Sequence, residues 1–419
     1  MPLNLETEAI VKSIVKECTG LPIGVITMAR TMRGVTDVFE WRDSLVKLKE
    51  SSIGQTNMEK KVLMNLKFSY DRLGNPNVQQ CFLSCALYPE DELIHKFELV
   101  EFFIDQRLIG ELNTRKEQYD RGLTIMNKLE NVCLLEYYDS PWSVYGKRMK
   151  MHDLIRDMAL HIMSATSIVK SGKGLKRIPH EEYWTDALEK VSLMKNNISE
   201  FSLNLSPNCP KLSTLLLDYG LSHDVVIPNS FFKNLCELKV LNLSGHNMTE
   251  LPNSISDLVN LRALLLRYCM ELRHIPYLGK LTSLRKLDAK NCRSLEALEG
   301  LEKLVNLRYL DLIETRIERL PKGMLDHLLN LQYLKFLVVN KEDITKLEAL
   351  ETSRCYLKNV DDFNKCVSAI ERSNNPRYYD LNVHLEKTKF IAEVSDHTRF
   401  GNLRNLGRES SFGTGVMPL

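Results

Sequence analysis

Residues 307–321 read LRYLDLIETRIERLP, and the spacing of their apolar side chains decides the fold of the second half of the chain. Leu310 and Leu312 flank Asp311, so a short strand here turns two leucines to one face and the aspartate to the other. Proline cannot donate a hydrogen bond to a sheet, so Pro321 marks a place where the chain has left the strand. A single unit of this kind cannot bury its leucines alone, and the stretch therefore predicts a stack of similar units.

Similar segments recur on both sides of this stretch. They begin at Leu238, Leu261, Leu284, Leu307 and Leu331, at intervals of 23, 23, 23 and 24 residues, and looser copies begin at Leu188 and Leu212. A period of this size with an LxxLxL core is the signature of leucine-rich repeats. Such repeats need a small polar group three residues after the last leucine, and Cys269, Cys292 and Thr315 stand at that position. The pattern predicts a solenoid with a continuous leucine spine.

The strands of such a solenoid also present a second set of side chains on its concave face. Aromatic and charged residues are frequent in this set, which is typical of a surface that recognises protein. Taken singly, each of them is more simply a solvated strand residue. The predicted recognition surface consists of Asn242, Ser244, Arg267, Lys286, Asp288, Lys290, Tyr309, Asp311, Tyr333 and Lys335.

The first half of the chain shows helical spacing of its apolar residues between about residues 5 and 165. Two short extended runs, LLEYY and RMKMHD, flank a turn that contains proline and glycine, and they predict a hairpin. Helices followed by a small hairpin form a winged-helix arrangement, which often binds DNA. Here no basic recognition helix follows, because KFELVEFFIDQRLIG is acidic and apolar. We therefore expect this part to bind protein and not nucleic acid.

Composition agrees with that expectation. Lys and Arg number 56 and Asp and Glu 54, so the net charge is only +2, and no global field favours nucleic acid or an anionic membrane. No stretch is apolar for long enough to span a bilayer, and the N-terminus lacks a signal peptide. Ten cysteines at irregular spacing, without a CxxC pair, argue against a disulfide framework and a zinc ribbon. We expect a chain with reduced thiols in the cytoplasm, with the nucleus or the periphery of the plasma membrane as alternatives.

Nothing in the sequence points to catalysis or to a metal site. The two histidines His152 and His161 lack the HExxH spacing, and no GxSxG elbow occurs. Cys81 and Cys85 lie one helical turn apart among apolar residues, so they are expected to be core thiols. The segment YPED at 88–91 predicts a turn and the cap of the next helix.

Five ordered motifs connect the first half to a known family. They are ECTGLPIGVITMARTM, LKFSYDRL, CFLSCALYPEDELI, LENVCLLE and KMHDLIRDMAL, and leucine-rich repeats follow them. In this order they resemble plant intracellular immune receptors of the nucleotide-binding, leucine-rich-repeat type, most closely the coiled-coil class. The resemblance covers the chain to about residue 345. It implies the helical and winged-helix domains of an NB-ARC module, followed by an α/β solenoid, and hence an α+β multidomain protein.

The resemblance also implies roles for single residues. Met151, His152 and Asp153 match the family's switch motif, in which the histidine contacts the phosphate of bound ADP and the aspartate fixes a contact between domains. A helix N-terminus favours anions, which agrees with that role, although a histidine at a helix start is more commonly a simple cap. Pro22 matches the proline of the family's GLPL motif, which packs against adenine. The next residues depart modestly from the family, since this chain has Ile23 and Gly24.

The largest departure from the family is a missing motif. No GxxxxGK[ST] loop occurs in these 419 residues, and neither does the family's signalling coiled coil. The intact family uses ADP or ATP as cofactor, whereas we expect this chain, read as truncated at its N-terminus, to hold no nucleotide tightly and to be no enzyme.

The sequence therefore predicts five segments and one principal function. That function is the part of a plant disease resistance receptor that recognises a pathogen effector or a guarded host protein, under an ADP/ATP switch. The alternatives are a nucleotide-independent binding module or decoy that docks on full-length receptors, and a nonfunctional truncated product. The segments are the GLPL helical region at 1–56, a winged-helix domain at 57–165, a linker at 166–186, leucine-rich repeats at 187–345, and degenerate repeats or an incomplete C-terminal region at 346–419.

Overall fold

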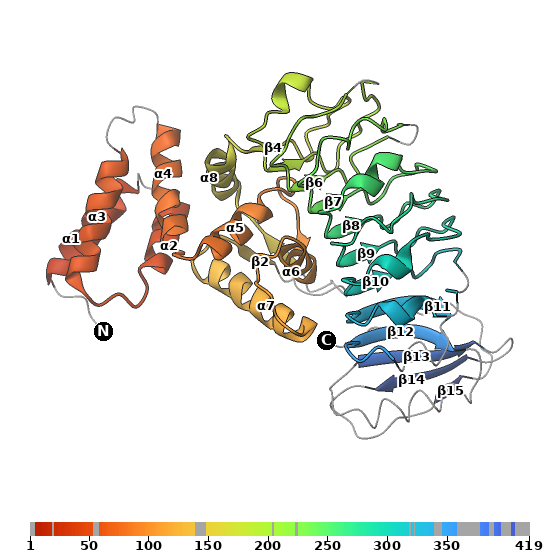
Figure 1. The fold of residues 1–419 in the computed structure, drawn as a ribbon. Coiled ribbons are helices and arrows are strands. Elements are labelled where there is room, and N and C mark those ends of the chain that lie inside the picture. Colours follow the sequence, from red (N-terminus) through yellow and green to blue (C-terminus); the bar gives the residue numbers. More distant parts are fainter. Residues whose placement is uncertain are drawn as a thin grey trace. The chain divides into compact units, whose positions relative to one another are not determined.

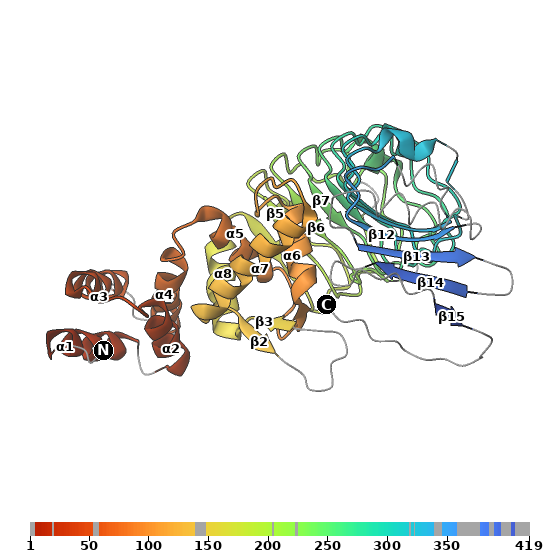
Figure 2. The ribbon, with the colours of Figure 1, turned by 90° about the horizontal axis from the view of Figure 1, so that it is seen from below.

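The structure is a computed structural model, and it divides the chain into two compact units, Met1–Ala165 and Thr166–Leu419. Both units are drawn in Figure 1 and Figure 2. The described residues are 5–18, 21–52, 58–138, 148–202, 205–222, 225–317, 320–321, 323–338, 346–357, 378–384, 389–394 and 404–406.

The first unit begins with four helices. α1 packs against α3, and α4 packs against both α2 and α3. Their shared core includes Ile14, Met28, Met32 and Leu48, which are nearly inaccessible to solvent. The helix α2 starts with Pro22 at its first turn, where a missing N–H costs nothing and the fixed φ favours a helix. The four helices are α1 (Leu5–Glu17), α2 (Pro22–Thr31), α3 (Val38–Ser52) and α4 (Met58–Asp71).

A winged helix follows in the same unit. The expected hairpin is present as β2 and β3, and β1 pairs antiparallel with β3, giving a three-stranded sheet in the order β1-β3-β2. The turn of the hairpin, 139–147, lies outside the described residues. The elements are α5 (Pro76–Cys85), β1 (Ile94–His95), α6 (Lys96–Asp105), α7 (Arg115–Asn131), β2 (Glu136–Tyr138), β3 (Arg148–Lys150) and α8 (Asp153–Met163).

The core of the winged helix is closely packed. Cys81 and Cys85 are buried among apolar side chains, so the prediction of core thiols is confirmed. The helices α6 and α7 approach closely at Gly122, where an added Cβ would lie 2.6 Å from Cγ1 of Val100. Glycine at this position lets the two helices approach without displacing Val100.

The second unit is a single twelve-stranded sheet that runs from β4 to β15 in chain order. The strands from β4 to β13 are parallel, as stacked repeats require, and short 3₁₀ turns lie between some of them. The strands are β4 (Ser167–Val169), β5 (Lys190–Ser192), β6 (Thr214–Leu216), β7 (Val240–Asn242), β8 (Ala263–Leu265), β9 (Lys286–Asp288), β10 (Tyr309–Asp311), β11 (Tyr333–Val338), β12 (Thr352–Leu357), β13 (Tyr378–His384), β14 (Lys389–Val394) and β15 (Arg404–Leu406). The 3₁₀ turns are η1 (Glu181–Tyr183), η2 (Asn253–Asp257), η3 (Leu301–Lys303) and η4 (Met324–His327).

Both ends of the repeat array differ from the sequence-based expectation. The segment 166–186, expected to be a linker, contributes β4, which pairs in parallel with β5 and extends the sheet. At the other end, where degenerate repeats or an incomplete C-terminal region were expected, β12 and β13 continue the parallel sheet, whereas β14 and β15 pair antiparallel. Both segments are polar and their apolar residues are irregularly spaced, so the sequence did not predict these strands, which form only by pairing with a neighbouring strand.

The leucine spine is continuous through the regular strands. Leu241, Leu264, Leu287, Leu310 and Leu334 occupy the same register position and are fully buried. The expected turn residues also make their bonds. The Sγ atoms of Cys269 and Cys292 contact the carbonyls of Leu243 and Leu266, at 3.2 and 2.9 Å, and the hydroxyl of Thr315 donates to that of Leu312 at 2.8 Å.

One member of this turn series was missed in the sequence. His246 stands at the position equivalent to Cys269, and its Nε2 lies 2.9 Å from the carbonyl oxygen of Leu217. Burial lowers the pKa of His246 to about 4, so the ring is neutral at physiological pH and Nε2–H is the donor. Its position three residues after Leu243 could have revealed it in the sequence, because a hydrogen-bond donor other than cysteine or threonine can also fill that position.

Candidate switch motif and recognition face

His152 is the N-cap of α8. Its Nδ1 accepts a hydrogen bond from the backbone N–H of Leu154 at 3.2 Å, and Asp153 follows as the exposed first residue of the helix. An Nδ1 that accepts must carry no proton, so the neutral ring holds its proton on Nε2. Nε2 has no hydrogen-bond partner among the described residues. The ring is therefore fixed by one nitrogen and has a donor available at the other.

Two contacts tie the residues around His152 to the YPED turn. Lys150 forms an ion pair with Asp91 at 2.7 Å, which raises the pKa of Lys150 and lowers that of Asp91. Arg156, buried on α8, donates from Nε and Nη2 to the carbonyl oxygen of Tyr88 at 3.2 and 3.0 Å. Burial lowers the pKa of Arg156. Two motifs that lie about 60 residues apart in the sequence thus form one structural unit.

The cap of α6 corrects the prediction made for YPED. These residues form a turn, with Asp91 at a φ of 60°, but the cap of the next helix is His95. Its Nδ1 accepts from the backbone N–H of Phe97 at 3.3 Å, in the same way as His152 on α8. In both cases the helix begins just after a strand of the small sheet, and a histidine side chain caps it.

Pro22 is the first residue of α2. It is exposed at the start of α2, and α4 packs against both α2 and α8, the helix that His152 caps. A cavity of about 580 Å³ lies beside α2, lined mainly by apolar side chains such as Ile14, Met28 and Trp41, but Pro22 is not part of its lining. The described contacts do not join Pro22 to His152.

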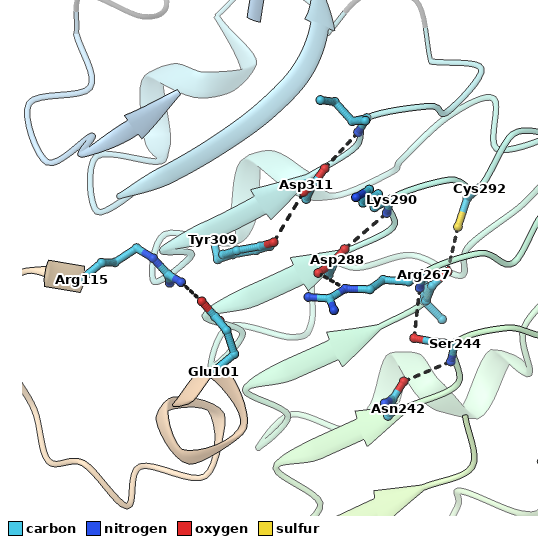
Figure 3. A network of polar contacts seen from close by, with 12 residues as sticks. Glu101, Arg115, Asn242, Ser244, Arg267, Asp288, Lys290, Cys292, Tyr309 and Asp311 are labelled. Carbon is cyan, nitrogen blue, oxygen red and sulfur yellow. Dashed lines mark hydrogen bonds and ion pairs between the residues drawn. The ribbon is translucent and has the colours of Figure 1, made fainter. Parts of the chain in front are cut away.

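The predicted recognition residues fall into three rows that cross the strands. Parallel register places Lys286, Tyr309 and Tyr333 in one row, and Asp288, Asp311 and Lys335 two residues further along the same strands. Asn242 belongs to the second row, and Ser244, Arg267 and Lys290 form a third row just beyond the strands. Figure 3 shows several of these side chains converging from successive strands.

Half of these residues are less accessible than expected. Ser244, Lys286, Asp288, Tyr309 and Asp311 have exposed fractions of 0 to 6%, whereas the other five are intermediate. Neighbouring strands in a sheet are about 4.8 Å apart, so long side chains cover their neighbours in the same row. The rings of Tyr309 and Tyr333 stack 4.1 Å apart, and the ammonium groups of Lys286 and Lys335 lie 5.0 Å from the centroids of the Tyr309 and Tyr333 rings.

The acidic members are held by defined donors (Figure 3). Arg267 Nε donates to Asp288 Oδ2 at 2.6 Å, and the backbone N–H of Ile313 donates to Asp311 Oδ1 at 3.1 Å. Asn242 accepts from the N–H of Ser244 at 3.1 Å in the same local geometry. Burial, reinforced by the neighbouring charge of Asp288, raises the pKa of Asp311 to about 6. The predicted recognition residues therefore include a carboxylate whose charged form is disfavoured by burial and by a neighbouring negative charge.

In the described part of the chain, neither a metal-ligand cluster nor a membrane-spanning helix is present. No group of three His, Cys, Asp or Glu side chains there could hold a metal ion. None of the helices there is both long and apolar enough to cross a membrane.

Comparison with known proteins connects this geometry to a family. Residues 87–159 match the model of the winged helix domain of disease resistance proteins. In Arabidopsis thaliana, a protein named as a probable disease resistance protein is 37% identical over 277 residues, which are 65% of this chain and 29% of that protein. The disease resistance proteins RPS5 and SUMM2 of that plant are 36% and 35% identical over 265 and 262 residues, 61% and 60% of this chain. The chain thus spans less than a third of the length of these relatives.

Among solved structures, a leucine-rich-repeat protein of Leptospira interrogans is 18% identical and covers 50% of this chain and 58% of that chain, with a TM-score of 0.34. That likeness is too slight to support an argument. The repeat fold rests on the register and spine described above.

Proposed function

Because this chain is a relative of plant disease resistance proteins and carries their winged helix domain, we propose that it forms the switching and recognition part of a plant immune receptor. One observation carries the proposal: a disease resistance winged helix and a leucine-rich-repeat sheet are joined in a single chain. In this role the repeats bind a pathogen effector or a guarded host protein, and the winged helix transmits that event. The role requires binding and switching, and no catalytic group is assigned.

The concave rows from β9 to β11 are the surface we assign to protein recognition. The stacked pair Tyr309 and Tyr333 and the cations Lys290 and Lys335 supply rigid aromatic area and charge, which are the components of binding hot spots. The partly exposed members, Arg267, Lys290, Tyr333 and Lys335, would make direct contacts. The buried members would hold these exposed side chains in position through their hydrogen bonds and ring contacts.

The switch motif is assigned to nucleotide sensing in a receptor that also has the phosphate-binding domain. His152 would donate its Nε2–H to a phosphate oxygen of ADP, because Nδ1 is already engaged at the helix cap. Pro22 would lie against the base. The phosphate charge of bound nucleotide would stabilise the closed state. The contacts of Lys150 and Arg156 would couple the position of α8 to that of the YPED turn.

The test is a substitution in the gene as the plant carries it. Asp153→Val should raise basal defence, measured as ion leakage and defence transcripts in leaves without any pathogen. Asp157→Val is the matched control, since Asp157 is also exposed on α8 but one turn away from the motif. Unchanged basal defence in Asp153→Val plants, at equal protein level, would sink the assignment.

A further inference from the structure

Each regular repeat places one residue in the left-handed region at the same turn, two positions beyond the spine residue that follows the strand. The φ angles of these residues lie between 51° and 77°, although only one of them is glycine. In five of these turns, at Lys195, Tyr219, Gly245, Tyr268 and Asn291, the residue donates its backbone N–H to the carbonyl of the next repeat at 2.7 to 3.0 Å. The turns therefore follow one another at the spacing of the strands. The series is Lys195, Tyr219, Gly245, Tyr268, Asn291 and Glu314.

Two tyrosines in this series are unusual. A bulky residue at positive φ is a rare and strained choice, yet Tyr219 has a φ of 51° and Tyr268 a φ of 59°. Both rings are also open to solvent, with exposed fractions of 47% and 38%. Strain and exposure at these two positions do not favour folding.

The glycine between them completes the arrangement. The ring of Tyr219 lies over Gly245, where an added Cβ would collide with it. Gly245 thus leaves room for the ring on an otherwise bare stretch of backbone. Burial raises the pKa of Tyr219 to about 12, so its hydroxyl stays protonated and can donate a hydrogen bond.

The spacing of these turns matches one kind of ligand. Tyr219 and Tyr268 follow β6 and β8, two strands apart, which places their backbones about 9.6 Å apart at the usual strand spacing. A polyproline II helix repeats every three residues, or about 9.3 Å. Glu314 follows β10, two further rows along, and is exposed. A ligand in this conformation would therefore bring residues i, i+3 and i+6 to Tyr219, Tyr268 and Glu314.

We propose that this series, here called the tyrosine edge (Tyr219, Gly245, Tyr268 and Glu314), binds a proline-rich segment of a partner protein in the polyproline II conformation. Prolines at i and i+3 stack on the two tyrosines, and a lysine or arginine at i+6 pairs with Glu314. Aromatic rings favour such segments because the ligand is already extended and loses little entropy on binding. The basic residue follows from charge complementarity with Glu314.

The inference rests on the proposed role of the repeats in recognising protein, and it concerns the turn residues that directly follow the third row. Peptide binding is measured without immune signalling, so either proposal can fail alone. The probe is an acetylated peptide of six prolines followed by one arginine, titrated calorimetrically into the purified 419-residue chain. Matched peptides replace the arginine by glutamate or the prolines by alanines.

We expect saturable binding of the arginine peptide and weaker binding of both matched peptides. Tyr219→Ala and Tyr268→Ala should each weaken binding about tenfold, since each removes a stacked ring while keeping a Cβ at the strained turn. Tyr277→Ala should leave binding unchanged, because Tyr277 is equally exposed, at 45%, but lies outside the edge. Glu314→Gln, a change of charge alone, should cost about threefold with the arginine peptide and nothing with the glutamate peptide.

Three results would overturn the proposal. They are no saturable binding at millimolar peptide, equal binding of the alanine peptide, and an equal loss on Tyr277→Ala. If the alanine variants fail to fold, Glu314→Gln still tests the proposal. An ion pair at i+6 predicts that the unchanged chain binds the arginine peptide more tightly than the glutamate peptide, and that Glu314→Gln removes this difference.

Discussion

The winged helix and the repeat array bury charged groups in different ways. In the winged helix, Glu101 and Arg115 form one ion pair between α6 and α7, with side-chain exposures of 11% and 8%, and Tyr119 donates to the same carboxylate. In the array, Asp288 and Asp311 lie in a row, and the chain repeats the same local bond at Asn242. The ion pair of the winged helix occurs once, so no other contact replaces it when it is lost. In the array, each charged side chain of a row can also interact with side chains of the adjacent repeats. We therefore expect substitutions to have larger effects in the winged helix.

The largest effect is expected from Glu101→Ala. It removes the carboxylate from the buried guanidinium of Arg115, which should cost about 3 to 5 kcal/mol in the free energy of unfolding. Loss of helical circular dichroism in urea measures it. Glu98→Ala is the control, since Glu98 is exposed on the same helix and should change stability by less than about 0.5 kcal/mol. Similar values for both variants would remove the contrast between the two regions.

The next effect has the opposite sign and depends on pH. Asp311 has a pKa raised to about 6 in the folded protein, above the unfolded value near 3.8, so the folded protein binds the proton more tightly. Stability is then lost as pH rises through this window. Asp311→Asn should stabilise the protein by about 1 to 3 kcal/mol at pH 7.5 and by almost nothing at pH 3.5.

Asparagine keeps the acceptor for the N–H of Ile313, as Asn242 does for Ser244. The readout is fluorescence of Trp184, which is buried in the repeat core. Asp288→Asn is a second variant: it removes the neighbouring charge that helps raise the pKa of Asp311, so the loss of stability between pH 3.5 and 7.5 should become smaller, although the bond from Arg267 is weakened. A gain that stays constant between pH 3.5 and 7.5 would contradict the account.

A smaller change in stability is expected at the two histidine caps of the winged helix. His152→Ala and His95→Ala should each cost about 1 kcal/mol in the free energy of unfolding, because each leaves one helix N–H without its acceptor. His152→Asn should restore most of that stability, since asparagine is a good cap, but not the proposed phosphate contact. If alanine costs nothing at either position, the caps are not structural.

The smallest effect concerns the repeat turns. Glu314→Gly should stabilise the chain by about 0.5 kcal/mol, because relief of the left-handed strain slightly exceeds the extra entropy lost by glycine. Gly245→Ala should be destabilising instead, since its Cβ meets the Tyr219 ring. Chemical denaturation of both variants with Trp184 as the probe tests the pair, and a gain for Gly245→Ala would refute the packing argument.

The sequence alone determined the parts of this protein that repeat or alternate. The 23-residue period predicted the parallel strands, and Cys269, Cys292 and Thr315 make the bonds expected of them. The two runs around 139–147 predicted the hairpin of the winged helix. Such features could be predicted because each depends on neighbours in the chain or on one repeated interval.

Only the tertiary structure decided which side chains are accessible and which partners they meet. The register of the strands buries Asp288 and Asp311, which the sequence placed on an open face, and the expected linker 166–186 contributes the strand Ser167–Val169 to the sheet. Folding also joins Arg156 to Tyr88 and engages Nδ1 of His152, leaving Nε2 as its donor. These outcomes depend on distances between residues far apart in the chain, and spacing along a sequence does not contain them.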